Sequence, residues 1–164
     1  PYKVWVALGA GEPDPRKGFR FWAVLTPAVL IAAALCGGTI GWGLDILQLS
    51  PFPILADIII INNFTLSMIL TPILLALLYL RVKKWGLIYT DVLDPSELSA
   101  GRFRIPALFI VVLGCAGFYL LGNAISFRIL DLGGAYAIGK EGIPGAGYWI
   151  TPFVILAFLG AALL

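Results

Sequence analysis

The sequence contains no histidine, two cysteines and one methionine among its 164 residues, and only 12% of the residues are charged. Histidine is the usual axial ligand of haem, the commonest zinc or copper ligand and the default general base. Its absence argues against redox, metal and acid–base chemistry, so we expect no enzymatic activity, no cofactor and no metal site. Eleven Lys and Arg residues against nine Asp and Glu residues leave a net charge of +2, which is too balanced to predict a nucleic-acid partner.

The low charge accompanies a hydrophobic content of 60%. A water-soluble domain of this size carries about twice as much charge. The composition therefore predicts an all-α, polytopic bundle of membrane helices in a cell membrane, with the lipid bilayer as its immediate partner. Cys36 and Cys115 each lie within an apolar run. We expect both to act as small hydrophobic residues and not to form a disulfide bond with each other. The chain starts at Pro1 and stops within an apolar run, as a piece of a longer protein would.

Four apolar segments are long enough to cross a hydrocarbon core of about 30 Å. A helix over residues 52–80 would be about 43 Å long, so we expect 52–61 to form a separate broken or re-entrant piece. Residues 1–20 include a proline-rich turn and are expected to lie at the membrane surface. All of these elements belong to one predicted membrane domain, residues 1–164. The predicted spans are residues 21–44, 63–80, 105–127 and 148–164.

Basic residues predict the orientation of these spans, because short cytoplasmic loops are enriched in Lys and Arg. Four basic residues precede the first span, five lie in the connection 81–104, and two lie in the loop before the last span. We therefore predict that the N-terminal segment and the loop 81–104 are cytoplasmic. This arrangement requires residues 52–80 to cross the membrane only once.

Asp57 is the first candidate for a functional residue. It lies in an isoleucine-rich run, and an ionisable group at membrane depth is costly enough to suggest a function. The alternative is that the predicted break raises Asp57 to the membrane interface near Asp45 and Trp42, where a carboxylate costs little.

A polar stripe runs along the predicted span 63–80. Asn63, Ser67 and Thr71 are four residues apart, so they share one face of a regular helix. Such a stripe can line an intramembrane cavity for a small polar solute. The alternative is that these side chains hydrogen-bond neighbouring helices, which contributes about 0.6–2 kcal/mol each. The ligand-binding residues that we predict are Asp57, Asn62, Asn63, Ser67, Thr71 and Asn123.

Two pairs of small residues lie in the predicted span 21–44. Gly37 with Gly41, and Ala28 with Ala32, have the spacing that lets membrane helices approach closely. These pairs predict helix packing or contact with another membrane subunit, and the spacing alone does not choose between the two.

Asn62-Asn63-Phe64 is followed at residues 71–87 by TPILLALLYLRVKKWGL, an apolar helix that ends in a basic and aromatic junction. This segment, about residues 51–97, resembles the substrate-binding S components of energy-coupling factor transporters. The resemblance implies a protein that captures a vitamin or similar micronutrient and works with a transmembrane coupling subunit and two cytoplasmic ATPases. In that family the coupling contact often uses small residues four apart in the first helix, a spacing that Ala28 and Ala32 share. S components usually have six spans, against the four predicted here.

These observations favour a membrane transport component that binds a small solute between its helices. The alternative is a non-catalytic accessory subunit of a larger membrane complex. In that case the same polar residues would join helices, and the faces of small residues would contact other membrane subunits.

Overall fold

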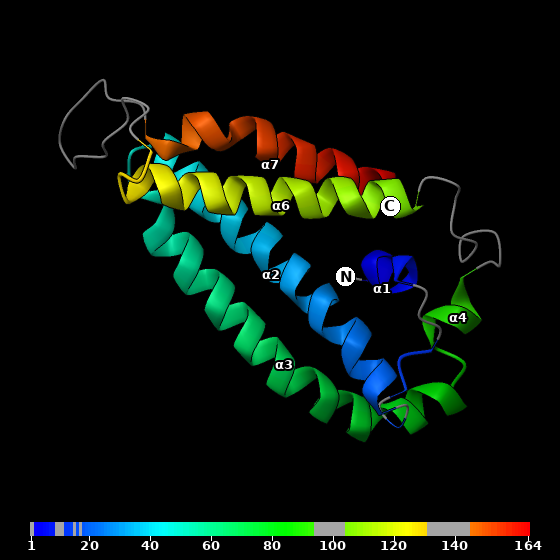
Figure 1. Cartoon of the computed structure of the whole chain (residues 1–164). Helices are drawn as coiled ribbons and strands as arrows, with labels where there is room; N and C mark the ends of the chain where they lie inside the picture. The colour runs from blue at the N-terminus through cyan, green and yellow to red at the C-terminus, as the bar shows by residue number, and fades with distance from the viewer. Residues whose placement is uncertain (1, 9–11, 15, 17, 94–103, 131–144) are drawn as a thin grey trace.

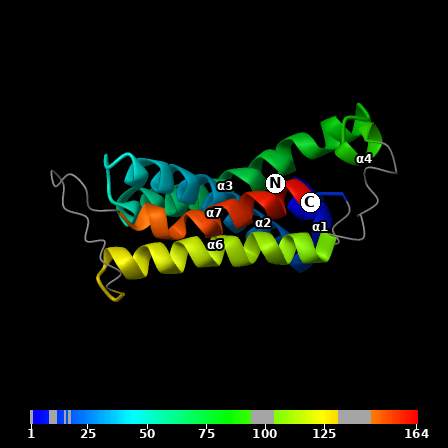
Figure 2. The ribbon, with the colours of Figure 1, turned by 90° about the horizontal axis from the view of Figure 1, so that it is seen from above.

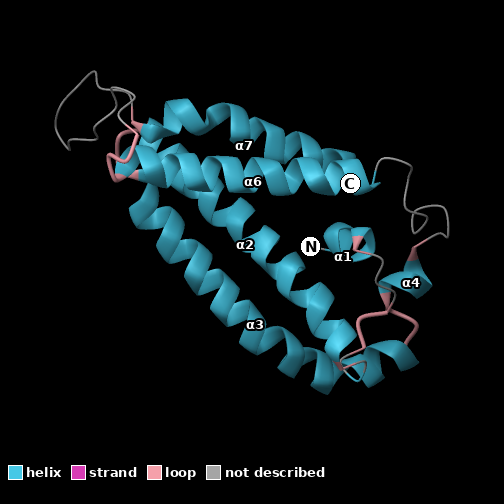
Figure 3. Cartoon of the chain, viewed as in Figure 1, coloured by secondary structure: helices cyan, strands magenta, loops and turns pink. Residues whose placement is uncertain are grey.

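The computed structural model describes residues 2–8, 12–14, 16, 18–93, 104–130 and 145–164. Four helices in this part of the chain are long and apolar enough to cross a membrane: α2, α3, α6 and α7. The predicted all-α membrane bundle with four crossings is therefore confirmed, and Figure 3 shows the helices joined by loops with no strand among the described residues. The helices are α1 (Tyr2–Ala7), α2 (Phe19–Ile46), α3 (Phe52–Lys84), α4 (Tyr89–Val92), α6 (Arg104–Ser126) and α7 (Ala146–Leu163).

The helices form two antiparallel pairs, α2 with α3 and α6 with α7, which diverge from a common end (Figure 1). The turns after α2 and α6 lie at this common end, whereas α1, α4 and the end of α7 lie at the other. Seen from above, α6 and the C-terminal half of α3 lie on opposite sides, with α7 between them (Figure 2). Successive long helices therefore start at opposite ends of the bundle, as they would in a chain that crosses a membrane four times. The basic residues Lys17, Arg102 and Lys140 lie outside the described residues.

The expected break at residues 52–61 is wrong, because α3 is one continuous helix of 33 residues. Pro53 lies in its first turn, where the fixed φ of proline is tolerated and its missing N–H is not needed. No glycine or proline follows until Pro72, so every backbone group between can continue the helical hydrogen bonds that a membrane demands. The helix is about 50 Å long, and it accommodates this length by running obliquely to α6 and α7 (Figure 1).

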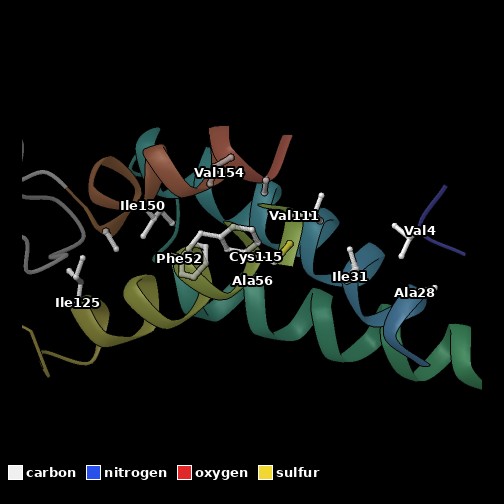
Figure 4. Close-up of a cluster of buried hydrophobic side chains, with 13 residues drawn as sticks. Val4, Ala28, Ile31, Phe52, Ala56, Val111, Cys115, Ile125, Ile150 and Val154 are labelled. Atoms are coloured by element: carbon white, nitrogen blue, oxygen red, sulfur yellow. The ribbon is translucent and has the colours of Figure 1, made fainter. Parts of the chain in front are cut away.

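Two phenylalanine rings fill the centre of the common end. Phe52 and Phe118 are almost fully buried and meet edge to face, with ring centroids 6.4 Å apart. Each ring lies against a glycine: Phe118 against Gly38 of α2, and Phe52 against Gly122 of α6. A side chain at either glycine would collide with the ring, so these two glycines make the space that lets α2, α3 and α6 meet. Figure 4 shows Phe52 within the buried cluster, together with Ile125 and Ile150.

Close helix contacts continue outward from this centre. On α2, Gly37 and Gly41 lie against Ala56 and Ile60 of α3, and a Cβ atom at Gly37 would come within 3.0 Å of the backbone oxygen of Ala56. The structure thus uses this pair of glycines, which the spacing predicted for packing or partner contact, within the chain itself.

Candidate functional site

A groove of about 420 Å³ separates α2 from α3 beyond the glycine contact. Its α2 wall is built from small and branched apolar residues, among them Ala28 and Ala32. These two alanines therefore face a cavity, whereas Gly37 and Gly41 on the same helix touch α3. Side chains of α1 and of the segment that follows it close one side. The lining residues are Trp5, Pro13, Leu25, Ala28, Val29, Ala32, Ala33, Asn63, Ser67, Thr71 and Leu75.

The α3 wall of the groove carries the predicted polar stripe. Asn63, Ser67 and Thr71 are each half-buried and follow one another at intervals of one helical turn. No hydrogen bond joins any of the three side chains to a described residue. The stripe therefore offers an amide and two hydroxyl groups to whatever occupies the groove, on a wall that is otherwise apolar.

The N-terminal segment is fastened across this region by aromatic and polar contacts. The ring of Trp5 is buried against Phe21 of α2, with centroids 5.9 Å apart. Further along, Glu12 accepts a hydrogen bond of 2.7 Å from the Tyr79 hydroxyl and forms a 2.6 Å ion pair with Lys83. Both partners lie near the end of α3, so these contacts hold the neighbouring Pro13 at the side of the groove.

Asp57 lies away from the groove, in a second cavity of about 450 Å³ near the common end of the helices. Its Oδ1 atom is buried and has no hydrogen-bond partner among the described residues. The phenol of Tyr119 on α6 interacts with the same carboxyl group. Ser126, at the end of α6, is the other polar side chain that lines this cavity.

The two remaining predicted ligand residues lie elsewhere. Asn62 is exposed on the face of α3 that points away from α2. Asn123 of α6 donates a 3.0 Å hydrogen bond to the backbone oxygen of Tyr119, one turn earlier in its own helix. The structure thus brings together Asn63, Ser67 and Thr71, and it separates them from Asp57, Asn62 and Asn123.

No family model, curated protein or solved structure was found to match the chain. The resemblance to S components therefore rests on residues 51–97 alone and remains a prediction.

Asp45 is the residue whose importance the sequence analysis missed. Its side chain is completely buried at the common end of the helices, and both oxygens accept backbone hydrogen bonds. Oδ2 accepts from the N–H of Phe52 at 2.8 Å, and Oδ1 accepts from the N–H of Gly147 at 2.7 Å. Phe52 is the first residue of α3 and Gly147 the second of α7. One carboxylate therefore caps two helix N-termini, where the helix dipoles favour negative charge.

A short polar chain lies next to this cap. The indole N–H of Trp42 donates to the Thr151 hydroxyl at 2.9 Å, and that hydroxyl donates to the Gly147 backbone oxygen at 2.8 Å. Gly145 and Gly147 leave room for Asp45, because a Cβ atom on either would collide with its carboxylate. The sequence did show a charged residue at the end of an apolar span. It could not show the partner of that residue in α7, because Gly147 lies 102 positions after Asp45.

Proposed function

We propose that this chain is the solute-binding component of a membrane transporter, with the groove between α2 and α3 as its binding site. The observation that carries the proposal is that Asn63, Ser67 and Thr71 all line one cavity of about 420 Å³. Their side chains form no hydrogen bond with a described residue, so they can bond a solute. This volume lies within the range of about 300–1,000 Å³ that is typical of small-molecule sites.

The lining sets the chemistry of the solute. Every described lining residue is uncharged, and the wall opposite the polar stripe is apolar. A charged solute would have to leave water without an opposite charge to meet it, which costs several kcal/mol. The solute that fits is a small, neutral molecule with an apolar body and hydrogen-bonding groups along one edge, a description that suits several micronutrients.

The distribution of basic residues supports an orientation for the transporter component. Arg20, Arg81, Lys84 and Arg104 lie at the diverging end of the bundle, and Arg128 lies at the common end. By the positive-inside rule, the diverging end, with α1 and α4, lies on the cytoplasmic side of the cell membrane. A transmembrane coupling subunit and cytoplasmic ATPases, which the resemblance to S components implies, would then meet this end.

The test is native mass spectrometry of the protein purified in a mild detergent, followed by a titration of the solute that is found. We expect one small neutral molecule per chain. Asn63→Ala removes a hydrogen bond worth about 1.4 kcal/mol, so the dissociation constant should rise about tenfold. Thr71→Ala should act in the same direction.

The matched controls are Asn62→Ala and Thr65→Ala, which remove the same side chains from the exposed face of α3. They should leave solute affinity unchanged. A protein that carries no solute but holds a fixed set of membrane subunits would overturn the transporter proposal and favour an accessory subunit.

A further inference from the structure

Of the four long helices in the described part of the chain, α3 has the smallest buried share of its apolar stretch. None of the residues 61–78 is buried, and this 18-residue stretch is apolar enough to span a membrane by itself. Lipid covers such a surface adequately where the side chains are apolar. Two exposed residues on the face that points away from α2, Asn62 and Thr65, are polar.

The depth of Asn62 makes its exposure expensive. It lies ten residues after Phe52, about 15 Å along an inclined helix, so its depth in the bilayer is smaller than this length, but it still lies within the apolar part of α3. An amide that faces lipid at that depth has neither water nor protein to bond, and such a group costs several kcal/mol. No hydrogen bond joins the Asn62 side chain to a described residue. A hydrogen-bond partner for this amide would therefore come from outside the described part of the chain.

The neighbours of Asn62 indicate the shape of that partner. Ile58, Asn62, Thr65 and Ile69 are all exposed and are separated by four, three and four residues. This spacing places them on one narrow stripe, and it is the repeat by which two helices pack side by side with a crossing angle of about 20°. A single asparagine in such a stripe fixes both the register and the number of helices.

We propose that two copies of this chain associate through the outer face of α3, with the Asn62 side chains hydrogen-bonded to each other. A carboxamide contains both a donor and an acceptor, so two copies related by a two-fold axis satisfy each other. Thr65 is small enough at the next position for the helices to approach closely. The inference does not depend on the proposed solute, because Asn63 lines the groove whereas Asn62, about 100° further round α3, does not.

The first experiment is disulfide crosslinking in native membranes, with Cys36 and Cys115 replaced by alanine in the full chain. New cysteines at Thr65 and Ile69, which leave Asn62 in place, should give a crosslinked dimer when a membrane-permeable oxidant is added. The controls are Asn63→Cys, which faces the groove, and Leu70→Cys, which is exposed but lies to the side of the stripe. Neither control should crosslink. Equal crosslinking at all four positions, or none at Thr65 and Ile69, would overturn the proposal.

The second experiment measures dimer dissociation in lipid nanodiscs or dilute detergent by single-molecule photobleaching. Asn62→Ala should weaken the dimer about tenfold, the effect of losing about 1.4 kcal/mol. Asn62→Gln retains the amide and should dimerise nearly as well as the wild type. Far-UV circular dichroism and the SDS content at which the protein unfolds report on folding, and both should stay unchanged in Asn62→Ala. A wild-type chain that is monomeric at every concentration, or that binds a different subunit on this stripe, would contradict the inference.

Discussion

Replacing Asp45 removes the only carboxyl group that is completely buried in the described part of the chain, and with it the caps of α3 and α7. In Asp45→Ala the N–H groups of Phe52 and Gly147 lose their acceptor while they remain buried. No other described acceptor bonds either group, so the helix starts have no alternative partner in the present packing.

The expected magnitude follows from these two bonds. Loss of one N-cap costs about 1 kcal/mol, and a buried donor without a partner costs about 1–3 kcal/mol. Part of this loss is offset because the carboxylate no longer has to be buried. We therefore expect Asp45→Ala to lower the free energy of unfolding by about 3 kcal/mol, or roughly 150-fold in the folding equilibrium. Asp45→Asn keeps one acceptor oxygen and should lose about half as much.

The assay is reversible unfolding in mixed micelles of increasing SDS content, followed by tryptophan fluorescence and far-UV circular dichroism. The control is Asp91→Asn, which changes an exposed carboxylate in the short helix α4 and should leave the transition in place. The reasoning is refuted if Asp45→Ala unfolds at the same SDS content as the wild type, or if Asp45→Asn is the less stable of the two variants.

Two smaller changes test the packing and the surface in the same unfolding assay. Gly114→Ala should destabilise the protein by about 1–3 kcal/mol, because the new methyl group would lie 2.6 Å from the backbone nitrogen of Ala157 on α7. Gly43→Ala is its control: nothing lies within 4 Å of the added atom, so stability should stay constant or rise slightly. Lys83→Met should leave the transition unchanged, since its ion pair with Glu12 is solvent-exposed. A destabilised Gly43→Ala or Lys83→Met variant would contradict these assignments.

The four membrane helices could be predicted from the sequence because the bilayer imposes a length and a composition on each of them. The polar stripe could be predicted in part for a similar reason. Residues four apart share a face whenever the helix is regular, and Asn63, Ser67 and Thr71 do so. The spacing of small residues did not predict what each of them would contact. The residues around Ala28 and Gly37 do not indicate that Ala28 faces a cavity and that Gly37 contacts α3.

The break expected near residues 52–61 came from comparing a helix length with a membrane thickness. The comparison omits inclination, which depends on how α3 packs against α2 and is invisible in a single segment. Asp45 was missed for a related reason. Its first partner, Phe52, is seven residues away, but its second, Gly147, comes from a helix 102 residues later. A helix cap supplied by a residue far away in the sequence produces no local sequence pattern by which it could be predicted.

The distances that separate Asp45 from its two partners along the chain imply an order of assembly. The hairpin of α2 and α3 is synthesised first, and the bond from Phe52 can close as soon as that hairpin forms. The other carboxylate oxygen then has no backbone donor until α7 is made. The same carboxylate therefore joins the turn of the first hairpin to the start of α7, and both of its backbone donors are present only when the two hairpins are together.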